Sequence, residues 1–219
     1  MNKIIESGDG SHTLYNESID EHYHSLNGAI QESMHVFIKN GLKCISKKEI
    51  NIFEMGFGTG LNALLTAQVA IREQRKINYT TVEKFPLDKN LTDKLNYSDN
   101  KTFKFSKEDF DKIHQAVWDK WHQINTFFRI RKIKTDMKDV KLDGIYDLIY
   151  FDAFSPDKQP DLWSEQVFKK LFNRMNKHAI LVTYSAKGII KRRLESIGFK
   201  VERLPGPPGK RHMIRAIKE

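Results

Sequence analysis

Apolar residues in this chain occur with two spacings that alternate along its length. Uninterrupted apolar or β-branched runs predict buried strands at residues 50–54, 78–83, 127–133, 146–151 and 178–184. Apolar positions three or four residues apart predict helices between them, at residues 61–75, 162–175 and 187–196. Strands that alternate with helices form a mainly parallel sheet, so the pattern predicts an α/β fold.

The N-terminal part departs from this alternation. Loose alternation over residues 11–24 predicts a hairpin, and an apolar face over residues 27–39 predicts a helix. We therefore expect residues 1–46 to form an extension that packs on a domain of residues 47–219.

Two further segments have their own signals. Residues 199–204 and 212–217 flank a Pro- and Gly-rich turn and predict an antiparallel pair, which adds an antiparallel strand at the C-terminal end of the sheet. Ser106 and Asp109 resemble a capping box. The helix they would open has an apolar face of Phe110, Ile113, Val117 and Trp121. Trp118 and Trp121 are interpreted as packing residues of that helix.

Composition limits the class of protein. The 219 residues are 39% hydrophobic and 30% charged, as in a globular domain. No apolar run approaches the ~20 residues of a membrane span, and the first residues lack the apolar core of a signal peptide. Cys44 is the single cysteine, which excludes an intrachain disulfide. We expect a cytoplasmic protein without membrane association.

Basic residues are concentrated near the C-terminus. The net charge is +9, and residues 151–219 hold 15 basic against 7 acidic side chains. Residues 187–219 alone hold 10 against 3. Basic charge concentrated at one end of a chain is typical of proteins that bind a polyanionic partner, nucleic acid first. A solvated basic surface gives the same pattern.

Glycines at alternate positions, Gly56, Gly58 and Gly60, follow the strand at 50–54 and precede a helix. Such a loop lets the backbone approach a ligand closely. A dinucleotide site requires a further glycine where this chain has Leu61. Glu54, two residues before the first glycine, suits a cationic ligand such as S-adenosylmethionine (SAM) better than a pyrophosphate.

Acidic residues also end the later strands, where ligands bind in parallel sheets. Glu83 is placed to accept hydrogen bonds from ribose hydroxyls, and Asp136 from an adenine amino group. Asn62 could reach the amino-acid end of the cofactor. The residues predicted to hold SAM are Glu54, Gly56, Phe57, Gly58, Gly60, Asn62, Glu83, Lys84, Asp136 and Asp152. The alternative is a glycine turn used only for packing, with acids that cap helices.

The segment Asp152-Ala153-Phe154-Ser155-Pro156 follows the fourth strand. Phe154 and Pro156 can wall a flat base. A protonated amine has no lone pair with which to attack, so an acceptor amine needs a group that takes its proton. Asp152 is the predicted catalytic residue, and the alternative is an aspartate that only caps the next turn. His22 and His24 have no third ligand at suitable spacing, so we interpret them as surface or hairpin histidines and expect no metal site.

Several motifs together resemble a known family, the methyltransferase module of MnmC, also found as a stand-alone enzyme called MnmD. The matching segments are residues 23–33, 36–37, 56–62, 83–87, 152–156, 160–163, 183–186, 192–194, 198–199 and 205–211. The resemblance implies a Rossmann-like class I SAM-dependent methyltransferase. It would methylate the amino group of 5-aminomethyl-2-thiouridine at the wobble position of tRNA, giving 5-methylaminomethyl-2-thiouridine.

The resemblance also implies roles for individual residues. Asp152 matches the catalytic-site aspartate, and the pocket is lined or bordered by Tyr23, Ser25, Glu32, Trp163 and Tyr184. The anticodon stem-loop phosphates would be contacted by Lys187, Lys191, Arg192, Arg193, Lys210, Arg211 and His212. No FAD oxidase module is expected in this chain. A separate flavin oxidase could supply the aminomethyl substrate, or that form could arise directly.

Two other classes of function remain open at this point. The first is a small-molecule methyl- or aminopropyltransferase of the same fold, for which a basic tail beside a cationic substrate would be unfavourable. The second is a non-catalytic RNA-binding module, which has no need of the acids at the strand ends.

Overall fold

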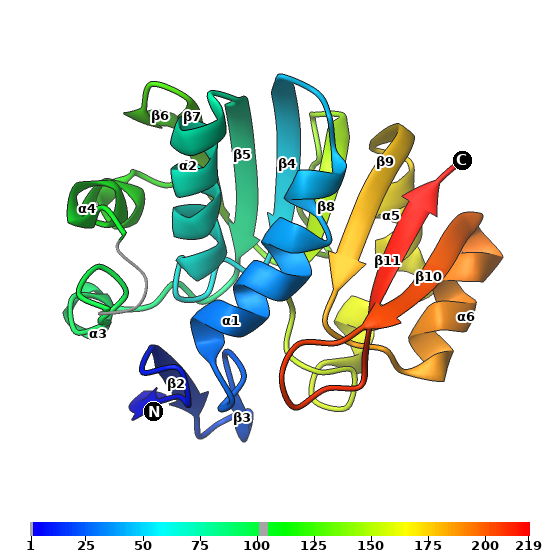
Figure 1. The fold of residues 1–219 in the computed structure, drawn as a ribbon. Coiled ribbons are helices and arrows are strands. Elements are labelled where there is room, and N and C mark those ends of the chain that lie inside the picture. Colours follow the sequence, from blue (N-terminus) through cyan, green and yellow to red (C-terminus); the bar gives the residue numbers. More distant parts are fainter. Residues whose placement is uncertain (1, 101–104) are drawn as a thin grey trace.

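An eight-stranded sheet forms the centre of the protein in a computed structural model that describes residues 2–100 and 105–219 (Figure 1). Its strands, in chain order, are β4 (Glu49–Met55), β5 (Lys76–Glu83), β6 (Trp121–Asn125), β7 (Phe128–Lys134), β8 (Tyr146–Phe151), β9 (Met175–Thr183), β10 (Phe199–Pro205) and β11 (His212–Lys218). In space the order is β10-β11-β9-β8-β4-β5-β7-β6.

Strand order reverses at β4, because β5 pairs with one of its edges and β8 with the other, both in parallel. Strands β7 and β9 extend this parallel core on the two sides. Strand β11 then runs antiparallel to both β9 and β10. The predicted mostly parallel sheet with a C-terminal antiparallel strand is confirmed, and its ligand edge lies where β4 and β8 end.

Helices cover both faces of this sheet (Figure 1). One face carries α1 (Ala29–Ser33), its π-helical continuation η1 (Met34–Lys39), α2 (Leu61–Glu73) and α4 (Lys107–Gln115), and the other α5 (Glu165–Phe172) and α6 (Gly188–Ile197). Shorter turns are η2 (Leu42–Cys44), α3 (Lys89–Thr92) and η3 (Pro160–Trp163). Neighbouring residues of β4 alternate between the two layers, Ile52 packing in one and Phe53 in the other. No helix in the described residues is long and apolar enough to cross a membrane.

The helix opened by Ser106 is shorter than predicted. Ser106 Oγ accepts the N–H of Asp109 at 3.0 Å, as the capping pattern indicated. The helix nevertheless ends at Gln115, Val117 is 56% exposed, and Trp121 begins the antiparallel edge strand β6, which was not predicted. The expected apolar face through Val117 and Trp121 is therefore wrong.

Lys132, on strand β7, explains why α4 stops there. Its buried ammonium donates to the carbonyls of Ile113 and His114 at 2.8 and 2.9 Å, so it caps the last turn. Burial lowers the pKa of Lys132 to about 8. Trp121 instead lies against the guanidinium of Arg129, 4.6 Å from ring centre to the central guanidinium carbon.

The N-terminal extension crosses the ligand edge of the sheet. Strands β1 (Asn2–Glu6), β2 (His12–Asn16) and β3 (Glu21–His22) form a small antiparallel sheet. This confirms the hairpin expected over residues 11–24 and adds β1, which the sequence did not predict. In Figure 1 the extension lies below the carboxyl ends of the central strands, so it can close one side of a site there.

Candidate active site

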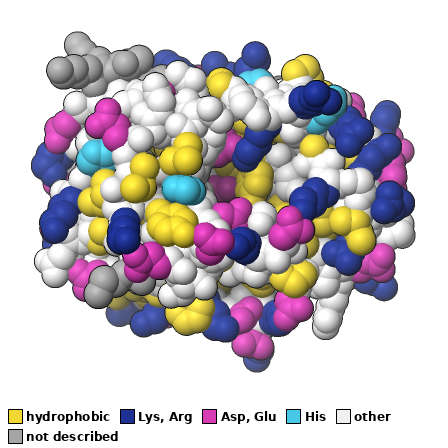
Figure 2. Space-filling model, turned by 90° about the horizontal axis from the view of Figure 1, so that it is seen from below, with side chains coloured by type: hydrophobic (Ala, Val, Ile, Leu, Met, Phe, Trp, Pro, Cys, Tyr) yellow, Lys and Arg dark blue, Asp and Glu magenta, His cyan; other side chains and the backbone are white. Residues whose placement is uncertain are grey.

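A cavity of about 640 Å³ opens at the carboxyl ends of β4, β5, β7 and β8, beneath the N-terminal hairpin. Figure 2 looks into this hollow from below, where acidic and apolar side chains gather. Many of the residues predicted from the sequence lie in its wall: Tyr23, Ser25, Glu32, Gly56, Phe57, Gly58, Asn62, Glu83, Lys84, Asp136, Asp152, Phe154, Tyr184 and Lys210.

The glycine loop brings the ends of β4 and β8 into direct contact. Gly56 has φ +90°, and a Cβ there would lie 2.6 Å from the carbonyl oxygen of Asp152. Gly58 has φ +49°, with the ring of Tyr23 3.1 Å from where a Cβ would stand. Both positions therefore require glycine, and the backbone forms a floor on which a flat ligand can lie.

Glu83 holds this loop in shape. Its two carboxylate oxygens accept the N–H of Gly58 at 3.1 Å and the N–H of Phe85 at 2.8 Å. Because each oxygen has a second lone pair, the carboxylate can also accept from a ligand in the cavity. The predicted role with ribose hydroxyls is compatible with this position and stays a prediction.

Asp136 lies across the cavity from the glycine loop, in the segment after β7. The N–H of Lys138 donates to it at 2.9 Å and the ammonium of Lys84 at 3.0 Å. These contacts, the Lys138 backbone hydrogen bond first, hold the pKa of Asp136 below its usual value. It is therefore a charged acceptor at neutral pH, as an adenine amino group would need.

Asp152 stands where the cofactor loop and the acceptor wall meet. The side-chain amide of Asn62, in the first turn of α2, donates to its Oδ2 at 2.8 Å. Burial and the nearby Glu32 carboxylate raise the pKa of Asp152 to about 7, although Asn62 and the ammonium of Lys210 oppose the rise. A carboxyl group with such a pKa can accept a proton near neutral pH.

Glu54 lies below the glycine loop and outside the cavity wall, fully buried. Its carboxyl group faces the side chains of Thr81, Tyr79 and Asn62, which oppose the rise of its pKa. Burial, with the charge of Asp152 nearby, raises the pKa of Glu54 to about 8. At neutral pH it is mainly protonated, so the negative charge offered to a cationic cofactor comes from other carboxylates.

The acceptor side of the cavity has aromatic walls. The rings of Tyr23 and Phe154 meet edge to face, 4.9 Å between centroids. The hydroxyl of Tyr184 donates to the carbonyl of Ala153 at 2.8 Å, which fixes this ring beside Asp152.

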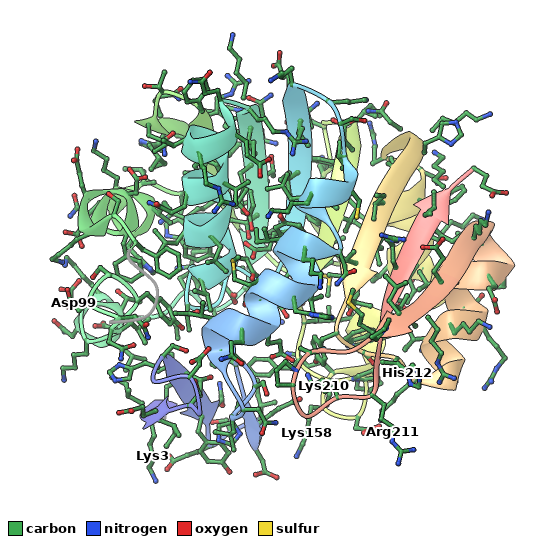
Figure 3. The ribbon with its side chains drawn as sticks, viewed as in Figure 1. Lys3, Asp99, Lys158, Lys210, Arg211 and His212 are labelled. Carbon is green, nitrogen blue, oxygen red and sulfur yellow. The ribbon has the colours of Figure 1, made fainter. Side chains whose placement is uncertain are left out.

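A charged clasp closes the far side of the same cavity. Lys210 Nζ lies 2.5 Å from Glu32 Oε1 and 4.1 Å from the centre of the Tyr184 ring. The other oxygen of Glu32 accepts the N–H of Ser25 at 2.8 Å. The loop between β10 and β11 is thereby tied to α1 across the cavity (Figure 3).

Other predicted residues lie outside the cavity wall. Trp163 is fully buried and donates its indole N–H to the carbonyl of Phe154 at 2.8 Å, so it supports the acceptor wall from behind. Gly60 begins α2 with φ +76° behind the loop. Pro156 does not reach the cavity surface.

The basic residues predicted to contact RNA divide into two groups. Lys187 pairs with Asp157, Lys191 with Glu195, Lys210 with Glu32, and Arg193 donates to the carbonyl of Trp163. The exposed side chains of Arg192, Arg211 and His212 make no side-chain hydrogen bond or ion pair with the described residues. Figure 3 shows Arg211 and His212 near Lys210, where the loop between β10 and β11 ends.

Two residues of the hairpin segment have contacts that the sequence did not indicate. His24, interpreted as a surface or hairpin histidine, follows strand β3 and is buried, with Nε2 2.8 Å from the hydroxyl of Thr59. Burial lowers its pKa to about 4, so it is neutral. Glu21 was not singled out, because its partner Ser155 is 134 positions away in the chain and no local pattern marks the contact. No group of three His, Cys, Asp or Glu in the described residues is placed to hold a metal.

This combination of sheet topology, glycine loop and acids at the strand ends defines a class I methyltransferase site. A family model described as S-adenosyl-L-methionine-dependent methyltransferase matches residues 108–219, about half of the chain. The chain belongs to this family and uses SAM. The cavity suits that cofactor, because the glycines leave room above the loop and the carboxylates of Glu83 and Asp136 lie in the cavity wall.

Known proteins resemble the chain over most of its length. The "tRNA 5-methylaminomethyl-2-thiouridine biosynthesis bifunctional protein MnmC" of Burkholderia multivorans is 30% identical over 92% of this chain and 33% of its own length. The crystal structure of MnmC2 from Aquifex aeolicus matches with a TM-score of 0.77 and 25% identity, over 99% of this chain and 70% of that one. The chain spans about a third of the curated relatives it matches.

A third likeness concerns the fold alone. Spermidine synthase from Thermotoga maritima matches with a TM-score of 0.58 and 10% identity, over 100% of this chain and 72% of that one. The same sheet therefore also occurs in an enzyme with another substrate.

Proposed function

We propose that this protein methylates the amino group of 5-aminomethyl-2-thiouridine at the wobble position of tRNA, giving 5-methylaminomethyl-2-thiouridine. The observation that carries the proposal is the position of Asp152, a carboxyl group with a pKa of about 7 between the cofactor loop and an aromatic acceptor wall. The relative from Burkholderia multivorans, whose name states this tRNA modification, supports the choice of substrate.

The chemistry of the site suits an amine acceptor. SAM supplies an electrophilic methyl group. Asp152 accepts a proton from the acceptor ammonium, which frees the nitrogen lone pair that forms the new N–CH₃ bond as the sulfur–methyl bond breaks. Asn62 fixes the orientation of the Asp152 carboxylate. Tyr23 and Phe154 stack around the base and exclude water, so alignment supplies much of the acceleration.

Charge around the cavity supports cationic reactants. Among the described residues its wall holds six acids and four lysines: Glu21, Glu32, Glu83, Asp136, Asp152, Asp161, Lys84, Lys138, Lys158 and Lys210. Both the sulfonium of SAM and the aminomethyl group of the nucleoside are cationic. An acid-rich cavity attracts both of them.

The tRNA backbone would bind outside this acidic cavity. Arg192 and Arg211 are exposed and have no side-chain partner within residues 2–100 and 105–219. In this proposal they serve the anticodon stem-loop phosphates together with the paired Lys187, Lys191, Arg193 and Lys210. Recognition of a single-stranded loop lets the wobble base turn out into the cavity. A separate flavin oxidase acting upstream, and a cytoplasmic location beside tRNA, belong to the same proposal.

A small-molecule transferase is the competing function. The acid-rich cavity would also accept a polyamine, and the fold is shared with a spermidine synthase. The exposed arginines of the basic C-terminal part favour RNA, because they would repel a polycation.

The two functions are separated by one incubation. The purified protein is mixed with methyl-labelled SAM, or with decarboxylated SAM labelled in its aminopropyl group, and either tRNA lacking the final methyl group or putrescine and spermidine. We expect label in 5-methylaminomethyl-2-thiouridine after digestion of the tRNA, and none in the amines. Label in an amine with none in the tRNA would replace the proposal by its competitor, and the Asp152→Ala protein controls for contaminating activity.

A further inference from the structure

The acceptor wall is a loop, residues 152–156, that other elements hold in place. The carbonyl of Ala153 accepts the hydroxyl of Tyr184 from the end of β9, and the carbonyl of Phe154 accepts the indole N–H of Trp163 from η3, both at 2.8 Å. These two contacts come from the same domain as the loop. They fix its first half from behind and from the side.

The next residue of the loop is held from the N-terminal extension. Glu21 Oε2 accepts both the backbone N–H and the hydroxyl of Ser155, each at 3.0 Å. Hydrogen bonds to a carboxylate are stronger than those between neutral groups. The two residues are 134 positions apart, so this contact exists only when the hairpin lies across the cavity.

The hairpin contacts both walls of the cavity. Glu21, at the start of β3, and Tyr23, just after this strand, both line the cavity. The Tyr23 ring meets Phe154 on one side and the open space at Gly58 on the other. Backbone pairing of Glu21 with Asn16 anchors this segment to β2.

We propose that Glu21 is a positioning residue for methyl transfer: it holds Ser155, and through it the loop carrying Asp152 and Phe154, in the geometry the acceptor needs. The inference rests on the proposed transfer to an amine of the RNA. Glu21 acts on the acceptor loop, so it governs turnover and leaves cofactor binding intact. Displacement of a reacting group by about 1 Å can cost about a hundredfold in rate.

A set of variants isolates this contact. Glu21→Ala removes both hydrogen bonds, whereas Glu21→Gln retains an oxygen that can accept both hydrogens. Ser155→Ala removes only the hydroxyl donor. Glu17→Ala, in the turn of the same hairpin, removes a carboxylate that pairs with Lys3 and serves as the matched control.

Kinetics give the first test, with SAM affinity measured by calorimetry. We expect Glu21→Ala to lower kcat about ten- to a hundredfold with an unchanged Kd for SAM, and Glu21→Gln and Glu17→Ala to stay within about threefold of the parent protein. Ser155→Ala should lose activity in the parent and none further in the Glu21→Ala background, because the two groups act through one contact. The inference would be overturned by unchanged turnover in Glu21→Ala or by a parallel loss of SAM affinity in that variant. It would also be overturned if the double variant lost activity by the product of the two single-variant losses.

Hydrogen exchange tests the same contact without any acceptor. The amide of Ser155 should exchange faster in Glu21→Ala, and at the parental rate in Glu21→Gln. Equal rates in all variants would contradict the positioning role. A parent protein that transfers no methyl to tRNA would instead refute the proposed function, so the two failures are distinguishable.

Discussion

Replacement of Asn62 by Leu tests how the site sets the proton affinity of its base. In the parent protein the Asn62 amide donates to Asp152 Oδ2 at 2.8 Å and stabilises the ionised form. Leu has the same branched outline, with two methyl groups in place of the amide oxygen and nitrogen, and has no donor. The carboxylate of Asp152 then becomes harder to form, and its pKa rises.

The size of the effect follows from the strength of that bond. A hydrogen bond to a charged group is worth about 1.5–3 kcal/mol, and a pKa unit is about 1.4 kcal/mol. The pKa of Asp152 should therefore rise from about 7 by roughly one to two units. At pH 7 the ionised fraction would fall from about a half to about 1–10%, so turnover drops about five- to fiftyfold.

The assay is a pH–rate profile at saturating SAM and tRNA, from pH 6 to pH 9.5. Turnover of Asn62→Leu should recover towards the parental level at the alkaline end, because the carboxyl group is ionised there in both proteins. Thr66→Val, one turn further along α2, is the control. It removes a buried hydroxyl that donates to the backbone carbonyl of Asn62, and it should leave the pH–rate profile unchanged. A loss of turnover that is equal at pH 7 and pH 9.5 would refute the assignment of Asp152 as the base.

Three further experiments test other parts of the site. Asp152→Ala should lose most turnover while SAM binding survives at least in part. Gly58→Val should abolish SAM binding, because φ +49° is unfavourable for a β-branched residue. Calorimetry with SAM compares the two variants. Glu54 stays protonated in the folded protein up to a pKa of about 8, whereas in the unfolded chain it ionises at its usual, lower pKa. Between these two pKa values the free energy of unfolding therefore falls by about 1.4 kcal/mol per pH unit. Glu54→Gln should flatten the resulting decline in melting temperature between pH 6.5 and 8. An unchanged decline would contradict the buried protonated carboxyl. The double variant Arg192→Glu, Arg211→Glu should bind tRNA at least tenfold more weakly and with a lower salt dependence in filter binding, while its Kd for SAM is unchanged. If the double variant bound tRNA as tightly as the parent protein, the RNA would bind elsewhere.

The parts of the fold predicted from the sequence are those with a local cause. The strand at 146–151 was predicted in full because all six of its residues are apolar or buried in a parallel sheet. Helix α6 ends within one residue of the predicted position 196, because Gly198 follows it with φ +109°. In both cases the signal lies within a few residues of the structure it specifies.

The errors arose where a distant residue decides. Helix α4 stops because Lys132, seventeen positions beyond Gln115, caps its carbonyls, and no pattern near Gln115 announces that contact. Trp121 lies on an edge strand because β7 offers it a partner. The spacing of apolar residues alone predicted that Trp121 belongs to the helix.

The site shows the same division. Topology placed Glu83, Asp136 and Asp152 correctly at one edge, because parallel strands share their carboxyl ends. It could not tell that Glu54, only two residues from the loop, points into the core. Nor could it find Glu21, whose partner Ser155 is brought near only by the folded hairpin.

The most direct test of the proposed function is nucleoside mass spectrometry of tRNA from a strain that lacks this protein. We predict that 5-methylaminomethyl-2-thiouridine disappears and 5-aminomethyl-2-thiouridine accumulates. The parental gene should restore the methylated nucleoside, and the Asp152→Ala gene should not. An unchanged level of 5-methylaminomethyl-2-thiouridine in that strain would contradict the account.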